Sequence, residues 1–338
     1  MGCARMKTKI VYVLVSSEDD IYLEQAYVSM LSAKHHMPDV HITLLTDSKT
    51  SESLTGTRKK ESAIADEIIV IELDPSISAQ KRSRLLKTNV RNYVQGDFLF
   101  IDCDTIIVKP LDEIDEIDVD MAACWDTHVP FKDNPYRSMC LKHGTKLEWP
   151  IENETEYFNS GVIFVRDIPA THNFFTRWNK NYQDGTLKRV SMDQPSLAKT
   201  NYELGHQIKT LPDCWNCEFK HGLRHFKDAK IIHYLCTSEN NGKMPPFLLN
   251  EKKILLQVKQ HGEITPQIEK LFDDPSKGIA PLTCLISGSD VLFFEDPLIV
   301  ILRSWYDKGK KAYKIISFLV RKCSLIKSKI RNKTKKLF

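Results

Sequence analysis

The chain has 338 residues, of which 42% are hydrophobic and 27% are charged, as in an ordinary soluble globular protein. No stretch approaches the ~20 uncharged apolar residues that a membrane span needs, which argues against a transmembrane protein. The net charge of +4 is uneven, because residues 301–338 carry thirteen Lys or Arg and one acid, a net of +12, and residues 1–300 carry −8.

The first hundred residues predict alternating strands and helices. Segments rich in β-branched and aromatic residues indicate buried strands at 9–15, 41–45, 67–73 and 98–102. Apolar residues at helical spacing predict helices at 21–36 and 82–94. This order predicts an α/β fold with a mostly parallel, Rossmann-like sheet and helices on both faces. Ligands of such folds bind at the carboxyl ends of the strands.

The rest of the chain continues the pattern and then changes. Strands are expected at 120–124, 157–165 and 230–235, and helices at 174–182 and 191–199. After residue 240, turns separate short helical segments. We therefore expect a catalytic domain over 1–240, a helical extension over 241–300 and a basic amphipathic helical tail over 301–338.

Two aspartates, Asp102 and Asp104, follow the strand in DFLFIDCDTIIV. In a haloacid-dehalogenase-type phosphatase the first carboxylate would be a nucleophile, but Ile106, the late position and the lack of a second acidic pair argue against this. Along a strand, residues i and i+2 point the same way and lie about 6–7 Å apart. Two carboxylates so placed can hold a divalent cation, which would neutralise a diphosphate leaving group.

The segment IDCDTIIVKPLDEI resembles the DxD region of GT-A-fold glycosyltransferases of family 8, the glycogenin-like and lipooligosaccharide galactosyltransferase-like group. Further blocks resemble that family in the same order over about residues 8–236. The resemblance implies a retaining enzyme that moves a hexose from UDP-glucose or UDP-galactose to a glycan or lipid-linked acceptor. It also implies a divalent cation, Mn²⁺ or Mg²⁺.

Two blocks resemble donor-binding segments of the family. The turn VSSEDD resembles the loop that holds the nucleobase and ribose, which implies Ser16, Ser17 and Asp19. The segment SRLL resembles the helix whose arginine reaches the diphosphate, which implies Arg84, with Lys87 nearby. A guanidinium suits phosphate oxygens, although Arg84 could instead belong to a solvated basic helix face.

Two further blocks resemble sugar-binding segments. CysTrpAsp implies Asp126 as a sugar-binding carboxylate, and YFNSGVIF implies donor contacts from Asn159, Ser160 and Gly161. The glycine would permit a close approach of the backbone. The alternative for the second block is a strand start with ordinary turn residues, which we consider the weaker of the two interpretations.

The segment SMDQPSL resembles the block in which Asp193 binds donor-sugar hydroxyls and Gln194 lies beneath the anomeric carbon. Ser191 and Gln194 also have the spacing of a helix capping box, with Pro195 in the first turn. Whether Gln194 attacks the sugar, or the acceptor enters on the leaving-group face, stays open at this point.

The resemblance also implies a third metal ligand, His233 in KIIHYL, beside Asp102 and Asp104. An imidazole ligand favours Mn²⁺ over Mg²⁺. The Lys-Pro-Trp that follows in the family is absent here, and Lys243 is the replacement that the sequence offers for binding the diphosphate.

The nine cysteines do not have the spacing of a disulfide framework, which indicates a reducing compartment. No secretory signal is visible, so we expect a cytoplasmic protein. Cys214 and Cys217 precede His221 and His225, but the gap is too short for a zinc finger, which favours packing cysteines.

The tail repeats apolar residues every three or four positions between Lys and Arg, as in a helix that lies on an anionic membrane surface. This pattern predicts a peripheral protein on the cytoplasmic face of a membrane, although a tail helix packed on the domain would show the same pattern. Nothing else in the sequence indicates a nucleic-acid partner. The sequence also leaves open a non-catalytic nucleotide-sugar-binding protein and, more distantly, a nucleotidyltransferase.

Overall fold

A computed structural model describes residues 6–221, 223–235, 247–279 and 288–334. The chain divides into two compact units, Met1–Leu285 and Ile286–Phe338, which are treated separately. Lys243, expected at the diphosphate, lies outside the described residues. The expected division at residues 240 and 300 stays a prediction.

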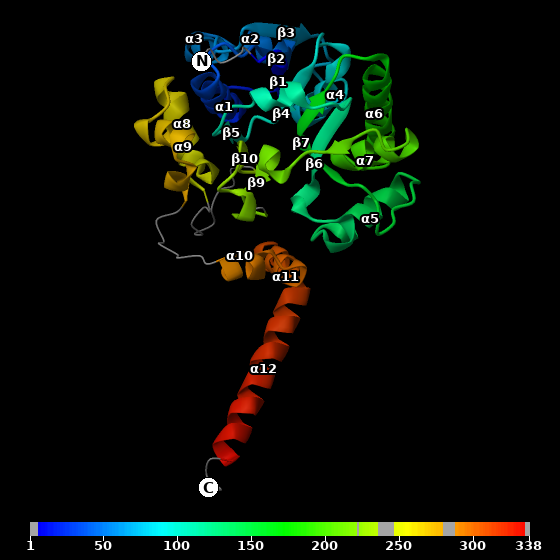
Figure 1. The fold of residues 1–338 in the computed structure, drawn as a ribbon, viewed down its shortest axis with the longest axis vertical. Coiled ribbons are helices and arrows are strands. Elements are labelled where there is room, and N and C mark those ends of the chain that lie inside the picture. The colour runs from blue at the N-terminus through cyan, green and yellow to red at the C-terminus, as the bar shows by residue number, and fades with distance from the viewer. Residues whose placement is uncertain (1–5, 222, 236–246, 280–287, 335–338) are drawn as a thin grey trace. The chain divides into compact units, whose positions relative to one another are not determined.

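The first unit is built on a seven-stranded sheet in the order β3-β2-β1-β4-β7-β6-β8 (Figure 1). Its strands are β1 (Lys9–Leu14), β2 (Ile42–Asp47), β3 (Glu67–Ile71), β4 (Phe98–Ile101), β6 (Met121–Trp125), β7 (Phe158–Val165) and β8 (Lys209–Thr210). Neighbouring strands are parallel except where β7 pairs with β4 and β6. The mostly parallel sheet is therefore confirmed.

Helices cover both faces of this sheet, as expected. The main ones are α1 (Tyr22–His36), α4 (Ala79–Thr88), α6 (Pro169–Leu187) and α7 (Gln194–Glu203). Alternate residues of β1 enter two different cores: Tyr12 packs in the core that holds Leu23 of α1, and Val13 packs in the core that holds Trp178 of α6. This double burial explains why β1 is apolar along nearly its whole length.

A second sheet of three strands has the order β5-β10-β9. Its strands are β5 (Thr105–Ile107), β9 (Cys217–Glu218) and β10 (Ile231–His233). The chain passes from the large sheet to the small one between β4 and β5, at residues 102–104. The aspartate pair therefore lies in a bend between two strands, and the expected strand geometry does not apply to it.

The remaining helices of the first unit are α2 (Ser48–Glu52), α3 (Gly56–Ser62), α5 (Arg137–Lys146), α8 (Lys252–His261) and α9 (Pro266–Asp273). Short 3-10 helices include η3 (Asp126–His128), η5 (Asp213–Asn216) and η6 (Leu223–His225). Both α8 and α9 pack on α1, and their apolar residues share a core with the small sheet.

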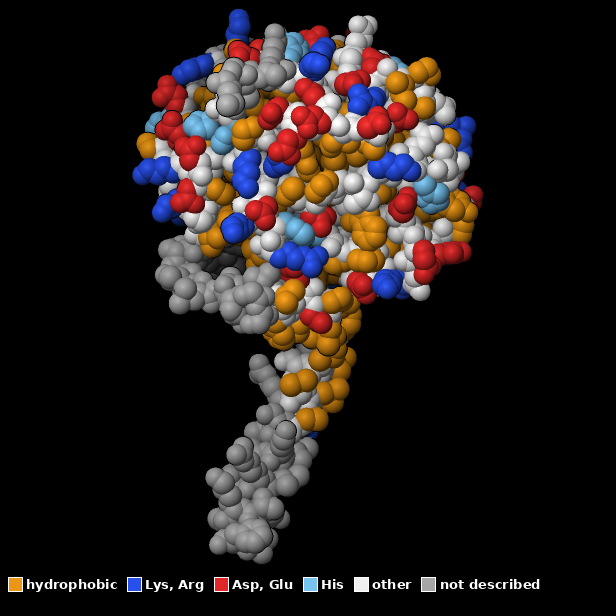
Figure 2. All heavy atoms as spheres, viewed as in Figure 1, with side chains coloured by type: hydrophobic (Ala, Val, Ile, Leu, Met, Phe, Trp, Pro, Cys, Tyr) orange, Lys and Arg blue, Asp and Glu red, His pale blue; other side chains and the backbone are white. Residues whose placement is uncertain are grey.

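The second unit consists of α10 (Gly288–Glu295), α11 (Pro297–Asp307) and α12 (Lys311–Thr334), which confirms a mostly helical C-terminal part. Many apolar side chains of this unit are exposed and appear orange in Figure 2. They include Leu292, Phe293, Leu298, Ile315, Phe318, Leu319 and Val320. None of the helices in the described ranges is long and apolar enough to cross a membrane.

Candidate functional site

Asp102, Asp104 and His233 converge where the two sheets meet. One ligand atom of each lies within 4.8 Å of the others. The antiparallel pairing of β10 with β5 places His233 opposite Thr105, next in sequence to Asp104. His233 Nε2 lies 3.1 Å from Asp104 Oδ1. The sheet topology therefore brings together the three residues expected to hold a cation.

The His233 ring is buried and is contacted at Nδ1, Nε2 and Cε1. Its Nδ1 lies 3.0 Å from Asn216 Oδ1. A Cβ built on Gly161 would lie 2.4 Å from His233 Cε1, so β7 approaches the ring as closely as a glycine allows. Burial by itself would lower the pKa of His233, but the Asp104 carboxylate outweighs it and raises the pKa.

Lys87 links Asp102 to the sugar-binding residue expected at Asp193. Its Nζ donates to both carboxylate oxygens of Asp102, at 2.9 and 3.0 Å, and lies 3.4 Å from Asp193 Oδ2. The Asp102 backbone N–H donates to Gly161 O at 2.7 Å. Asp102 is thus already paired with the ammonium group of Lys87, whereas Asp104 faces the imidazole of His233.

Arg84 points inward at Asp193 rather than along a solvated helix face. Its Nε lies 2.9 Å from Asp193 Oδ1, and Ser160 Oγ donates to Asp193 Oδ2 at 2.8 Å. Burial by itself would raise the pKa of Asp193, but Arg84 and Lys87 outweigh it and hold that pKa well below its usual range. Asp193 is therefore a carboxylate at neutral pH.

Asp126 is a buried carboxyl surrounded by amides. Asn134 Nδ2 donates to it at 2.8 Å, and the side chains of Gln194 and Asn159 also hydrogen-bond to it. Burial raises the pKa of Asp126 although these amides oppose the rise. The capping box expected at Ser191 does not form, because α7 begins at Gln194 and the N-cap Asp193 makes no side-chain capping bond.

The turn after Asp126 is strained, since Thr127 and His128 have φ values of 58° and 57°. Glu218 of β9 braces it: its Oε1 accepts from Thr127 N at 2.9 Å, and its own N–H donates to His128 Nε2 at 3.0 Å. Burial, with a contribution from the nearby Asp126 carboxylate, raises the pKa of Glu218 well above its ordinary value.

Polar groups of the loop after β1 hydrogen-bond to one another and to Arg58 of α3. Ser16 Oγ donates to Asp20 Oδ1 at 2.6 Å, and Ser17 N donates to Asp20 Oδ2 at 2.7 Å. Arg58 donates to Ser17 O and Ser16 Oγ. Asp19 is exposed. Because β1 runs parallel to β4, this loop lies at the same sheet edge as Asp102.

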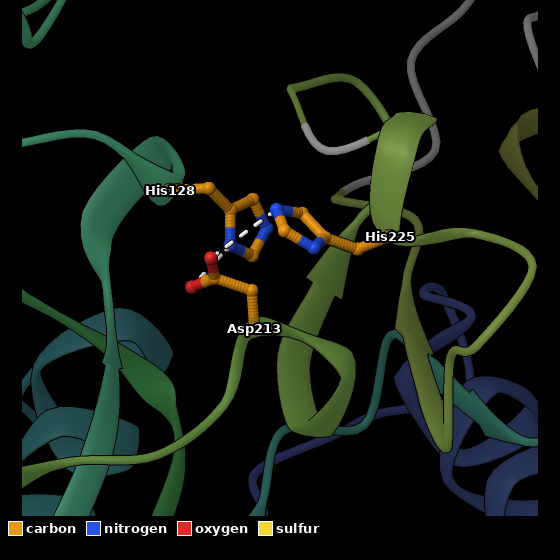
Figure 3. A group of neighbouring side chains, drawn as sticks. All are labelled: His128, Asp213 and His225. Atoms are coloured by element: carbon orange, nitrogen blue, oxygen red, sulfur yellow. Dashed lines mark ion pairs between the residues drawn. The ribbon is translucent and has the colours of Figure 1, made fainter. Parts of the chain in front are cut away.

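A second group, His128, Asp213 and His225, lies close together (Figure 3). His128 Nδ1 is 3.0 Å from Asp213 Oδ1, and His225 Nε2 is 3.2 Å from Asp213 Oδ2. Since His128 Nε2 accepts a backbone N–H, neutral His128 carries its proton on Nδ1. Arg224 Nε also donates to His225 Nε2. The proton on His128 Nδ1 fits a hydrogen bond to Asp213, whereas neutral His225, which accepts from Arg224 at Nε2, has no proton on that atom to give to Asp213.

Cys214 and Cys217 behave as packing residues, as expected. Cys217 is buried, Cys214 is partly buried, and both are free thiols. Among the residues that the structure describes, neither cysteine belongs to a group of three or more metal-ligand side chains.

Some site residues were not indicated by the sequence. Asn134, Asn216 and Glu218 contact Asp126, His233 and the strained turn, but each stands in a stretch that reads as an ordinary turn or short strand. The one available signal was position, since Asn216 directly precedes the short strand β9 and Glu218 belongs to it, opposite His233 of β10.

The profile of Glycosyl transferase family 8 matches residues 13–244, more than half of the chain. The chain belongs to glycosyl transferase family 8. It is therefore a glycosyltransferase that uses a nucleotide-sugar, and the phosphatase and non-catalytic interpretations no longer apply. No curated protein sequence matches the chain.

Solved structures show the same fold at low sequence identity. Galactosyltransferase LgtC in complex with donor and acceptor sugar analogs is similar, with a TM-score of 0.51 and 15% identity over 80% of this chain and 100% of LgtC. An active-site mutant of LgtC gives a TM-score of 0.52 at 13% identity, over 79% of this chain and 99% of the mutant. The bifunctional WbbM gives 0.50 at 16% identity over 79% of this chain, but only 51% of WbbM is covered. These likenesses support the GT-A fold of the family 8 chain.

Proposed function

We propose that this family 8 enzyme is a retaining, metal-dependent hexosyltransferase that takes UDP-glucose or UDP-galactose as donor and a glycan or lipid-linked sugar as acceptor. The observation that carries the proposal is the convergence of Asp102, Asp104 and His233 within 4.8 Å. Directly beside it lie Lys87, Arg84 and Asp193. These residues at one edge of the sheet support a cation and the diphosphate of a nucleotide-sugar binding side by side.

The three side chains fit Mn²⁺ or Mg²⁺ as a donor set. Two carboxylates supply hard oxygen ligands, and the imidazole favours Mn²⁺. Asp104 is the better candidate for direct contact, because both oxygens of Asp102 already accept from Lys87. When bound, the cation would neutralise the charge that develops on the leaving diphosphate.

The charged residues around the site would position the donor. Arg84 is partly exposed and lies next to Asp193, so its guanidinium can reach phosphate oxygens without leaving the carboxylate. Asp193 is ionised and suited to accept hydrogen bonds from sugar hydroxyls. The Asn159 amide oxygen already accepts from Gly161 N and Asn216, so its Nδ2 is the atom left for a ligand and for Asp126.

Two routes to retention are consistent with this arrangement. Gln194 hydrogen-bonds to Asp126 at the start of α7, so its carbonyl could lie below a bound sugar and attack the anomeric carbon. Alternatively, the acceptor enters on the leaving-group face, and a diphosphate oxygen takes its proton. We propose that Gln194, Asp193 and Asp126 hold the sugar in either case.

A donor panel tests the proposal. The metal-free full-length protein is incubated with UDP-glucose, UDP-galactose or GDP-mannose, with Mn²⁺, Mg²⁺ or neither, and donor hydrolysis is followed. We expect hydrolysis of a UDP-sugar that requires the cation and is lost in Asp104→Asn. Asp118→Asn, which changes an exposed acid, is the matched control.

Cation-independent hydrolysis, or equal rates for the two variants, would contradict the proposed role of Asp104. Turnover of GDP-mannose alone would contradict the UDP-sugar assignment. Thermal stabilisation by UDP with Mn²⁺ gives a second readout that does not depend on the acceptor.

We also propose that the second unit attaches the enzyme to an anionic membrane on its cytoplasmic face. Residues 301–338 carry a net charge of +12, and α12 exposes Ile315, Phe318 and Leu319 between basic residues. A basic amphipathic helix of this kind binds anionic lipid through both its charge and its apolar side chains. A lipid-linked acceptor would suit such a location.

A further inference from the structure

We propose that Asn216 is a positioning residue that fixes His233 in the tautomer with a proton on Nδ1, so that the Nε2 lone pair faces Asp104 and a divalent cation. The inference rests on the proposed function, because it takes His233 as a metal ligand. Asn216 ends η5, is fully buried, and contacts His233 from the side opposite Asp104.

The argument starts from a backbone amide, which can act only as a donor. The N–H of Gly161 lies 2.8 Å from one side-chain atom of Asn159, so that atom must be the amide oxygen, Oδ1. The same Oδ1 lies 3.0 Å from an amide atom of Asn216. Because Oδ1 accepts, the facing atom of Asn216 must be its nitrogen, Nδ2.

The orientation of Asn216 then determines the proton on the histidine. With Nδ2 turned to Asn159, the Asn216 oxygen faces His233 Nδ1 at 3.0 Å, so Nδ1 must carry a hydrogen. Neutral imidazole has one N–H, which leaves a lone pair on Nε2. That lone pair points at Asp104 Oδ1, 3.1 Å away, where an imidazole nitrogen and a carboxylate can share a cation.

Burial increases the importance of this chain of hydrogen bonds for the orientation of the ring. Asn159, Asn216 and His233 are 7%, 0% and 3% exposed, so bulk water cannot take the place of a missing partner. The close approach of Gly161 prevents the ring from moving toward β7. The backbone N–H of Gly161 in β7 thus determines the donor and the acceptor in each bond from Asn159 through Asn216 to His233.

Two measurements on the full-length protein test the role of Asn216. In protein labelled with ¹⁵N-histidine, two-bond ¹⁵N–¹H spectra at alkaline pH report the tautomer of neutral His233, assigned with His233→Gln. Titration of metal-free protein with Mn²⁺, followed by electron paramagnetic resonance, gives the Mn²⁺ affinity without any donor. The variants are Asn216→Leu, Asn216→Asp and, as control, Asn181→Leu, which removes another buried amide, one that bonds to Thr200 and Glu203.

We expect Nδ1–H in the wild type and a mixture of tautomers in Asn216→Leu, with Mn²⁺ affinity reduced about 10–100-fold, as for other residues that orient metal ligands. Asn216→Asp keeps an acceptor on Nδ1 but loses the bond to Asn159 Oδ1, so it should retain the tautomer and bind Mn²⁺ more tightly than Asn216→Leu. Asn181→Leu should change neither.

A proton on Nε2 in neutral wild-type His233, or unchanged tautomer and affinity in Asn216→Leu, would overturn the inference. If the wild type binds no Mn²⁺ but the tautomer responds as expected, the proposed metal site fails and the role of Asn216 stands. If Asp104→Asn loses Mn²⁺ binding while Asn216→Leu keeps it, the proposed metal site stands and the role of Asn216 fails. Should Asn216→Leu not fold, the wild-type spectrum and Asn216→Asp decide.

Discussion

The ammonium group of Lys87 holds the carboxylate of Asp102, with Nζ 2.9 Å from Oδ1 and 3.0 Å from Oδ2. The Lys87 side chain is only 3% exposed, whereas that of Asp102 is 25% exposed. The ammonium group of Lys87 is therefore buried, and the carboxylate of Asp102 is the more accessible partner of the pair. This pairing limits how much of Asp102 is left for a bound cation.

Replacing Lys87 by Met should reduce the free energy of unfolding by about 3 kcal/mol, because removing one partner leaves buried Asp193 without one of its two cations. Mn²⁺ should stabilise Lys87→Met more than the wild type, because Asp102 is released from its ion pair. Denaturant unfolding with and without Mn²⁺ measures both effects. Lys81→Met, on the same helix, is the control, and equal Mn²⁺ responses would contradict the competition for Asp102.

Gly161→Ala should displace the His233 ring, because the new Cβ would lie 2.4 Å from Cε1 and 2.8 Å from Nδ1. Such overpacking costs about 1–3 kcal/mol of unfolding free energy. Part of that cost should vanish in the His233→Ala background, where the ring is gone and the contact with Asn159 Oδ1, 2.9 Å from the new Cβ, remains. A cost that is the same in both backgrounds, measured by denaturant unfolding, would show that His233 is not the obstacle.

Glu61 gives the protein a pH dependence that is unrelated to catalysis. Glu24 and Glu61 are buried, and none of their carboxylate oxygens has a hydrogen-bond partner in the part of the chain that the structure describes, although Lys259 Nζ lies 3.6 Å from Glu24 Oε1. Burial, together with the charge of Glu24, raises the pKa of Glu61 to about 7 from 4.5. The folded state thus binds a proton that the unfolded state has lost, so the free energy of unfolding falls as pH rises from about 4.5 through 7.

Glu61→Gln should remove this dependence and stabilise the protein at pH 8 by about 2–3 kcal/mol relative to the wild type, with little gain at pH 5. Unfolding in urea at pH 5, 6, 7 and 8 provides the measurement. Glu52→Gln, which changes an exposed acid nearby, should leave the wild-type slope in place. An unchanged slope in Glu61→Gln would mean that Glu61 is ionised in the folded state.

Deleting the residues after Lys310 should abolish binding to vesicles that contain anionic lipid, while donor hydrolysis in solution stays near the full-length rate. Co-sedimentation with anionic and with neutral vesicles separates the contributions of charge and apolar contact, since binding through charge weakens with salt. Full retention by the truncated protein would place the membrane contact elsewhere or rule it out.

The fold and the central residues of the candidate site were predictable because their signals are local. Buried parallel strands are continuous apolar runs, and an acid pair directly after β4 had to lie at the ligand-binding edge of the sheet. The pattern also indicated helix α7, but it placed the start at Ser191 because Gln194 has capping spacing. In the structure Gln194 bonds to Asp126 instead, a contact that capping statistics cannot anticipate.

The parts that were not predicted depend on pairs far apart in the sequence. Asn216 and Asn159 are 57 residues apart, and each side chain alone resembles an ordinary turn or strand-end amide. One local feature was not predicted either: Asp20 makes the side-chain bonds within the loop after β1, while Asp19, expected at the nucleotide, is exposed. Asp19 and Asp20 are adjacent residues of the same type, so the sequence alone cannot show which of them bonds within the loop.

The junction between the two sheets has a consequence for the order in which the enzyme forms. Asp104 and His233 are 129 residues apart, and β10 follows every strand of the seven-stranded sheet in the sequence. Bringing them together closes one of the longer loops in the chain, which costs entropy and slows folding. A ribosome has therefore synthesised every strand of the large sheet before it reaches the last proposed ligand, so the cation site cannot be completed until after the strands of its scaffold have been made.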